Sequence, residues 1–232
     1  MFDTNKHKVV MLQILKEIYS DLELANCLGF KGGTALFFFY DLPRFSVDLD
    51  FNLLKSEKEN DVYNKVRNII SKYGKIEDEA KKFFGPVFLL NYGNGERNLK
   101  IEISNREWQF ENHYEILNYI GINMLVMTGP DMFANKLCTL LDRKVLTNRD
   151  IFDCWFFMQK KMHINKQIIE IRMNKPYADY LQDCINSIEK LSGKNLLNGL
   201  GELVSQETKT FVRNKLHSEL LFLLRFYKDF PI

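Results

Sequence analysis

The sequence predicts an α+β fold, in which a mixed sheet with flanking helices is followed by a C-terminal helical bundle. Segments 46–54 and 99–104 alternate between apolar and polar residues, as half-buried strands do, and segments of helical periodicity surround them. After about Gly129, helical periodicity alone continues to the end of the chain. We therefore expect one domain over residues 1–125 and a helical domain over residues 126–232.

The composition fits a globular protein without a strong overall charge. Of the 232 residues 46% are hydrophobic, which is enough to form a core, and the formal net charge is only +2. The four cysteines include no Cys-x-x-Cys pair, which indicates free thiols in a reducing cytosol rather than a zinc site. No apolar run approaches the roughly 20 residues that a membrane helix needs, so we expect a cytoplasmic protein without a membrane segment.

Local patterns justify the elements of the first half in turn. Residues 8–27 place apolar residues at helical spacing, and "KGGTALFFFYDLP" indicates a glycine turn before a short helix that Pro43 ends. "SVDLDFNLL" is typical of a strand, and the Ser-x-x-Glu sequence that begins at Ser56 predicts a capping box for the next helix. "VFLLNYGNGERNLKIEIS" predicts a β-hairpin around Asn94–Gly95.

Helix-start residues divide the second half into successive helices. Pro130 suits the first turn of one helix, and we expect Asn148 to cap the next. Pro176 begins another helix, and Glu207–Phe230 has the pattern of one long amphipathic helix.

Two aspartates on the strand 46–54 point to chemistry. Asp48 and Asp50 alternate with apolar neighbours, so both carboxylates lie on one face, about 7 Å apart along the strand. Like charges at this range are costly unless a cation neutralises them, and a divalent metal does so. Two metal ions held in this way can clamp the attacking and leaving oxygens of a phosphoryl or nucleotidyl transfer.

Gly32, Gly33 and Thr34 lie at the start of the expected short helix. Glycines let the backbone approach a phosphate closely, and a helix N-terminus offers free N–H groups and the positive end of a dipole. A Gly-Gly pair alone usually marks a turn, and an Asp-x-Asp alone usually marks a solvated strand face. Their combination within about twenty residues indicates a site for a nucleoside triphosphate.

The order of these motifs resembles that of a known superfamily. Gly-Gly-(Ser/Thr), followed about a dozen residues later by Asp-x-Asp on a strand, is similar to the signature of the DNA polymerase beta-type nucleotidyltransferases. The fuller pattern "KGGTAL…RFSVDLDF" and the later block "FANKLCTLLDRKVLTNRDIFDCWFF" resemble the AbiEii/AbiGii toxin branch, the toxin half of bacterial abortive-infection toxin–antitoxin systems. The resemblance covers residues 28–54 and 130–157, with a weaker match at "LKIEIS".

The resemblance implies a nucleotidyltransferase-type sheet and assigns roles to residues of the first half. Asp48 and Asp50 match the metal-binding pair, and Gly32–Thr34 match the phosphate-holding turn. Glu102 is expected as a third catalytic carboxylate, which would complete the metal site or help deprotonate the incoming hydroxyl. The alternative for Glu102 is an exposed glutamate of an edge strand.

Roles in the second half follow from the later block. Lys136 matches the motif lysine that contacts the triphosphate, and Arg143 lies on the same helical face. Asp150 and Asp153 match the acidic block, and one of them is expected to orient Lys136. Two further candidates for phosphate contacts precede the aspartates of the strand: Arg44 and Ser46.

The resemblance therefore implies a magnesium-dependent nucleotidyltransferase. With two Mg²⁺ ions it would transfer a nucleoside monophosphate from a nucleoside triphosphate (NTP) to an RNA acceptor, and the tRNA 3′ end is an acceptor known in the branch. A cognate antitoxin is the expected protein partner. Nine basic side chains of the helical half could guide the acceptor: Lys136, Arg143, Lys144, Arg149, Lys160, Lys161, Lys209, Arg213 and Lys215.

Two alternatives remain open at this point. An antibiotic-modifying nucleotidyltransferase shares the first motif block, and its polycationic substrate could bind the acidic pair Asp150 and Asp153. A catalytically silent NTP-binding module is the second alternative.

Overall fold

The chain divides into two compact units. The computed structural model describes residues 3–230 except residues 94, 144, 192 and 194. The first unit contains the chain up to Asp41, Phe45–Glu107 and Tyr114–Met127. The second contains Leu42–Arg44, Trp108–His113 and the chain from Thr128 on, so two short segments belong to it although their sequence neighbours belong to the first unit.

A mixed sheet forms the centre of the first unit. In the described part of the chain it has seven strands in the order β3-β4-β5-β2-β1-β7-β6. Strand β2 pairs in parallel with β5 and antiparallel with β1, and β1 pairs in parallel with β7. The bounds are β1 Leu28–Lys31, β2 Asp48–Leu53, β3 Lys75–Lys82, β4 Gly85–Asn91, β5 Leu99–Ser104, β6 Tyr114–Tyr119 and β7 Ile122–Met127.

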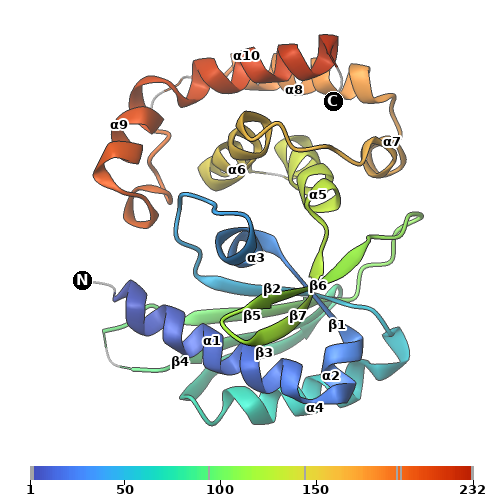
Figure 1. The fold of residues 1–232 in the computed structure, drawn as a ribbon, viewed down its shortest axis with the longest axis vertical. Helices are drawn as coiled ribbons and strands as arrows, with labels where there is room; N and C mark the ends of the chain where they lie inside the picture. Colours follow the sequence, from blue (N-terminus) through green and yellow to red (C-terminus); the bar gives the residue numbers. More distant parts are fainter. Residues whose placement is uncertain (1–2, 94, 144, 192, 194, 231–232) are drawn as a thin grey trace. The chain divides into compact units, whose positions relative to one another are not determined.

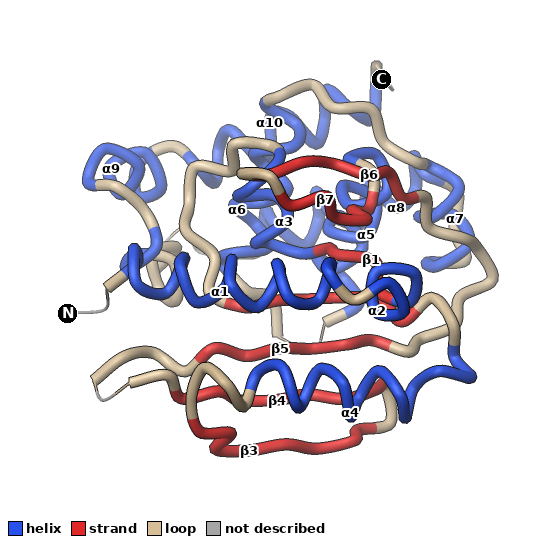
Figure 2. Tube along the Cα trace, turned by 60° about the horizontal axis from the view of Figure 1, so that its bottom comes forward, coloured by secondary structure: helices blue, strands red, loops and turns tan. Residues whose placement is uncertain are grey.

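Helices cover both faces of this sheet. In Figures 1 and 2, α1 (Thr4–Ser20), α2 (Leu22–Cys27) and α4 (Glu59–Ile70) lie on one face, and α3 (Gly32–Phe39) lies on the other. Leu49 and Phe51 of β2 have no exposed surface, because their side chains point away from the face that carries the aspartates. The hydrophobic core therefore fixes which face of β2 presents Asp48 and Asp50.

The second unit is helical. Its main helices are α5 (Gly129–Asp142), α6 (Asn148–Gln159), α7 (Lys166–Met173), α8 (Tyr177–Glu189), α9 (Gln206–Asn214) and α10 (Leu216–Asp229). Helix α5 packs against α6 and α7, and α10 packs against α8 and α6 (Figure 1). Tyr180 of α8 is buried and donates its hydroxyl hydrogen bond to the carbonyl of Leu137 over 2.8 Å, which ties α8 to α5.

The α+β class, the mixed sheet with flanking helices and the helical C-terminal part are confirmed. The hairpin over 87–104 is also confirmed, as β4 and β5 pair antiparallel with Leu90 opposite Leu99. Of its expected turn, Asn94 lies outside the described residues, as does Lys144 of the basic set. No helix in the described ranges combines the length and apolar character that crossing a bilayer requires.

Two predicted helices are each broken into two. Residues 8–27 form α1 and α2, because the Asp21 side chain accepts hydrogen bonds from the backbone N–H groups of Glu23 and Leu24 and caps a new helix. The expected final helix 207–230 changes direction at Lys215, where α9 ends and α10 begins. Each prediction was wrong in expecting one continuous helix, although the residues on both sides of the break are helical.

Two predicted caps were also wrong. Ser56 begins a 3₁₀ turn, and α4 starts only after Lys58, which makes no side-chain cap. Thr147 rather than Asn148 caps α6, with its side chain accepting from the N–H of Asp150. Four strands of the described residues were not predicted from the sequence: β1, β3, β6 and β7.

Candidate functional site

The first unit gathers carboxylates on one face of two neighbouring strands. Because β2 and β5 are parallel, Asp50 lies opposite Glu102 and Asp48 lies opposite Lys100 in the register. Lys31 of β1 lies opposite Asp50 on the other side of β2. Residues opposite each other share a face of the sheet, so three carboxylates and two ammonium groups lie together. The sequence-predicted residues Asp48, Asp50 and Glu102 are thus on adjacent strands of one unit.

The charges of this group are unbalanced. Burial raises the pKa of Asp50, the charges of Asp48 and Glu102 raise it further, and Lys100 opposes them. Lys100 Nζ lies 2.8 Å from Glu102 Oε2. Burial would raise the pKa of Glu102, but this ion pair holds it below its usual range. Two ammonium groups, Lys100 of β5 and Lys31 of β1, face three carboxylates, so the cluster has room for further positive charge.

Gly32 is required where α3 begins. Its φ is +80°, a conformation that favours glycine, and a Cβ at this position would lie 2.4 Å from Asp50 Oδ2. Any side chain here would collide with the Asp50 carboxylate. The predicted glycine turn and the predicted aspartate pair therefore meet at van der Waals distance.

Two buried side chains fix the backbone around Asp48. The hydroxyl of Thr34, which has no exposed surface, donates to the Asp48 carbonyl. His7 of α1 is also fully buried, and its Nε2 lies 3.0 Å from the Val47 carbonyl. A carbonyl only accepts, so Nε2 carries the hydrogen, and Nδ1 accepts from the Tyr92 hydroxyl over 2.5 Å. The carbonyls of two successive residues at the start of β2 are thus held from opposite sides of the sheet.

His7 was not among the predicted site residues, and Thr34 has a different contact from the one expected. The Thr34 hydroxyl is engaged by Asp48, so its backbone N–H is the group available to a phosphate at the start of α3. Ser46 precedes β2 rather than lying on it, and is buried. A phosphate contact by Ser46 stays a prediction.

The second unit contains a buried network of ion pairs. Lys136 Nζ of α5 lies 3.0 Å from Asp150 Oδ1 and 2.8 Å from Asp153 Oδ2 of α6. Asp150 also accepts from the Thr147 hydroxyl over 2.7 Å, and Arg143 Nη1 lies 3.2 Å from its Oδ2. The spacing of the two aspartates by three residues places both on one side of α6, and Lys136 bridges them.

Arg44 completes this network. Its Nε and Nη2 donate to the two oxygens of Asp153 over 2.6 Å and 2.7 Å, a bidentate pair with both side chains buried. This pair explains why Leu42–Arg44 belongs to the second unit. The phosphate contact expected of Arg44 stays a prediction, and the structure gives its guanidinium a carboxylate partner.

The electrostatics of the network keep all its members charged. Burial opposes charge on Asp153, but Arg44 and Lys136 lower its pKa to about 2. The pKa of Asp150 is lowered by Lys136 against the effect of its burial. Burial would lower the pKa of Lys136, but the two carboxylates raise it. Lys136 is therefore an ammonium group that remains 17% exposed.

Comparison with known proteins identifies the family. The family model described as "Nucleotidyl transferase AbiEii toxin, Type IV TA system" matches residues 13–219, which is most of the chain. The protein belongs to the AbiEii family. By this membership it is a nucleotidyltransferase, as the motif order indicated.

Two solved structures have the same fold as this AbiEii family member. A candidate nucleotidyltransferase from Helicobacter pylori has a TM-score of 0.65 at 22% identity, over 97% of this chain and 95% of that chain. JHP933 from Helicobacter pylori has a TM-score of 0.63 at 22% identity, over 99% of this chain and 94% of that chain. No curated protein matches the sequence at a significant level.

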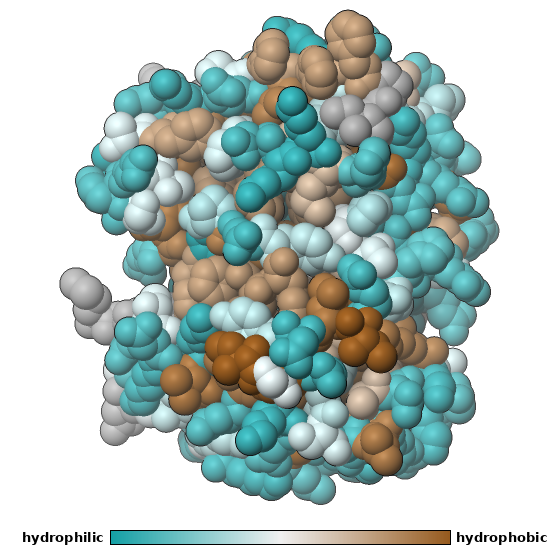
Figure 3. Space-filling model, in the orientation of Figure 1, coloured by the Kyte–Doolittle hydropathy of each residue, from teal (hydrophilic) through white to brown (hydrophobic). Residues whose placement is uncertain are grey.

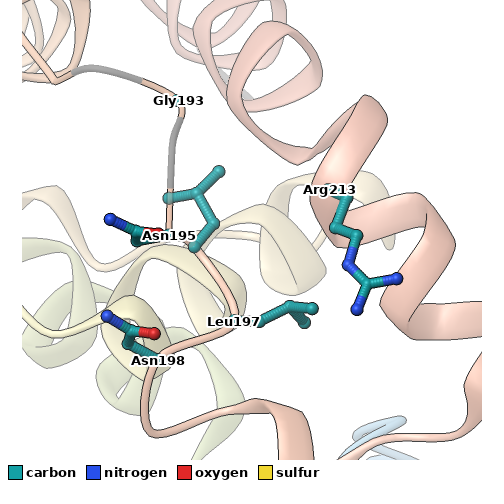
Figure 4. A pocket seen from close by; sticks show the side chains of 6 residues that line it. Gly193, Asn195, Leu197, Asn198 and Arg213 are labelled. Carbon is teal, nitrogen blue, oxygen red and sulfur yellow. The ribbon is translucent and has the colours of Figure 1, made fainter.

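Two surface hollows of this family member lie among residues outside the predicted site. One, of about 500 Å³, lies between α1 and the β6–β7 turn, where hydrophobic side chains gather in Figure 3. The other, of similar volume, lies beside α9 in the second unit. In Figure 4 Leu197 and the Arg213 guanidinium face each other across it, while the Asn195 and Asn198 amides turn away. The chemistry follows from the charged clusters rather than from these hollows.

Proposed function

We propose that this protein transfers a nucleoside monophosphate from an NTP to a hydroxyl group of RNA, with magnesium, and releases pyrophosphate. The observation that carries the proposal is the register that sets Asp50 opposite Glu102, with Asp48 on the same face and Gly32 against Asp50. Nucleotidyl transfer needs a helix N-terminus that binds phosphate next to a cluster of carboxylates that binds metal ions.

The cluster of Asp48, Asp50 and Glu102 carboxylates fits magnesium as a cofactor. Its donors are hard oxygen ligands. Burial raises the pKa of Asp50, and the charges of Asp48 and Glu102 add to this rise, which Lys100 and Lys31 only partly offset. Among the described residues no three His, Cys, Asp or Glu side chains already have the arrangement that holds a metal ion, so the fit rests on the sheet face that Asp48, Asp50 and Glu102 share. Asp48, Asp50 and Glu102 would hold the ions, which when bound would neutralise charge on the triphosphate.

The residues of the chain supply the other parts of the reaction. The backbone N–H groups at Gly32–Thr34 would bind phosphate oxygens, and Lys136 is assigned the triphosphate contact of the family motif. The ion pair with Lys100 keeps Glu102 ionised, and Glu102 is assigned either a metal ion or the proton of the attacking hydroxyl. The hydroxyl oxygen forms a bond to the α-phosphorus as the bond from that phosphorus to pyrophosphate breaks.

The biological role follows from the family. We propose that the protein acts in the cytoplasm as the toxin of a toxin–antitoxin pair, with a tRNA 3′ end as acceptor. A nucleotide added there would block aminoacylation and stop translation. A cognate antitoxin would relieve this effect.

The antibiotic-modifying alternative is less well supported. It required Asp150 and Asp153 to bind a polycationic substrate, but both carboxylates are buried and already paired with Lys136, Arg44 and Arg143. Little negative charge remains there for a substrate.

The test is label transfer. Wild-type protein is incubated with α-labelled NTPs, Mg²⁺ and total tRNA, beside the Asp48→Ala/Asp50→Ala double variant. We expect labelled RNA from the wild type and none from the double variant. Equal labelling by both proteins would refute the assignment of the aspartates, and no labelling by either would refute the reaction.

A further inference from the structure

The turn between β3 and β4 presents two phenylalanines to solvent. Lys82 of β3 pairs with Gly85 of β4, so Phe83 and Phe84 form a two-residue hairpin loop. Phe83 is 89% exposed and Phe84 is 46% exposed. Such loops usually contain Gly, Asn or Asp, so turn geometry gives no reason for two aromatic residues here. Exposed aromatic surface of this kind indicates a binding role.

The turn is held in place from β5. The backbone N–H of Asn105 donates to the Phe84 carbonyl over 3.1 Å, and the Arg106 guanidinium carbon lies 3.8 Å from the centre of the Phe84 ring. The rings of Phe83 and Phe84 meet edge to face, with centroids 4.8 Å apart. The aromatic pair is therefore ordered, while Phe83 leaves most of its surface open.

Two basic residues adjoin the rings. Lys82 precedes them in sequence and Arg106 stacks on Phe84. The Lys81 ammonium group instead bonds to Asn60. The Asn105 side chain engages Glu59 over 2.9 Å, and Glu107 is the acidic residue next to Arg106 in sequence. Aromatic rings flanked by Lys and Arg are the combination that binds single-stranded nucleic acid, in which bases stack on rings and phosphates pair with cations.

The turn is bonded to the residue that directly follows β5, the strand of the predicted catalytic glutamate. Asn105, which bonds to Phe84, follows Glu102 by three residues. At the rise per residue of a β-strand, three residues separate Asn105 from Glu102 by about 10 Å along the chain. A nucleic acid whose end lies at the carboxylates could therefore place a nearby base at the turn.

We propose that Phe83 and Phe84, with Lys82 and Arg106, form a stacking platform for an unpaired base of the RNA acceptor. The platform rests on the proposed function for its ligand. It binds single-stranded RNA near the acceptor end and discriminates against duplex RNA, whose base faces are covered.

Binding of a fluorescein-labelled 12-nucleotide single-stranded RNA, followed by anisotropy without NTP, tests the platform. We expect Phe83→Ala/Phe84→Ala to weaken binding roughly tenfold or more. Lys82→Gln/Arg106→Gln should reduce the slope of log affinity against log salt by about 1.4, the value for two phosphate contacts on a single strand. Phe222→Ala is the matched control, because Phe222 is a 63% exposed phenylalanine on α10, and it should bind as the wild type does.

Three outcomes would overturn the platform: no binding of the RNA by the wild type, equal binding by the Phe83/Phe84 variant, or equal binding of a duplex of the same sequence. A membrane role is tested in parallel with anionic lipid vesicles. Vesicle binding that depends on Phe83 and Phe84, with RNA binding unaffected, would also overturn it. Failure of the proposed function has a different signature, namely RNA binding with platform dependence but no label transfer by the wild type.

Discussion

Replacement of Asp153 by Asn tests the buried network of the second unit. The substitution keeps the shape of the side chain and removes its charge. Arg44 donates to Asp153 from Nε over 2.6 Å and from Nη2 over 2.7 Å, and Lys136 Nζ lies 2.8 Å from the same carboxylate. The side chain of Asp153 is 0% exposed, that of Arg44 is 3% exposed and that of Lys136 is 17% exposed. Lys136 keeps Asp150 as a partner, but Arg44 loses both of its bonds to a charged acceptor.

The expected loss is large because the buried Arg44 guanidinium loses the bidentate ion pair with the Asp153 carboxylate. Breaking such a pair costs about 3–5 kcal/mol of the free energy of unfolding. Urea unfolding followed by tryptophan fluorescence reports on the second unit, because both tryptophans of the chain, Trp108 and Trp155, belong to it. Glu189→Gln is the control, since its pair with Arg225 is exposed on both sides and should contribute under about 1 kcal/mol.

Acid unfolding gives an independent measure of the same pair. The pKa of Asp153 is about 2 in the folded protein and 3.8 in its unperturbed state. The stabilisation is therefore complete above pH 3.8 and is lost as the pH falls towards 2, a loss of about 2 kcal/mol. Asp153→Asn should lose correspondingly less stability than the wild type over this range. A urea effect under about 1 kcal/mol, or identical acid sensitivity of the two proteins, would refute the buried network.

Three further changes test the first unit. Gly32→Ala forces a side chain against the Asp50 carboxylate, and we expect a loss of about 1–3 kcal/mol in thermal melts and of label transfer by tenfold or more. Asp50→Asn should abolish transfer yet raise the melting temperature, because burial and neighbouring carboxylates disfavour the charged form; a lower melting temperature would contradict this. His7→Gln, which retains a donor for the Val47 carbonyl, should keep more activity than His7→Leu, and equal activities of the two variants would remove the positioning role.

Local patterns in the sequence predicted the parts of the fold that hydrophobic periodicity controls. The β2 and β5 strands alternate, since one face of each is buried, and Asn94–Gly95 indicated the turn between β4 and β5. β3 was missed because its sequence "KIEDEAKK" is charged, as suits a strand at the edge of a sheet. β1 was missed because its four residues, with Leu28, Gly29 and Phe30 buried, are too few to show a period.

The site was predictable where a motif is local and not where a contact joins distant residues. Gly32 and Asp50 lie within one motif, and the structure places them in contact. The pairing of Arg44 with Asp153 spans 109 residues, and no feature of a single sequence reports it. His7 could have been found, because it precedes Met11 by one helical turn on the buried stripe of α1, where a polar side chain needs a partner.

The intact mass of the RNA product shows whether the protein adds nucleotides to RNA. A purified tRNA is incubated with the protein, Mg²⁺ and each of the four NTPs in separate reactions, and its mass is measured before and after. The account predicts a gain of whole nucleoside monophosphate units with at least one NTP, matched by pyrophosphate release and absent for Asp48→Ala. An unchanged RNA mass with all four NTPs, or a gain that persists in Asp48→Ala, would contradict it.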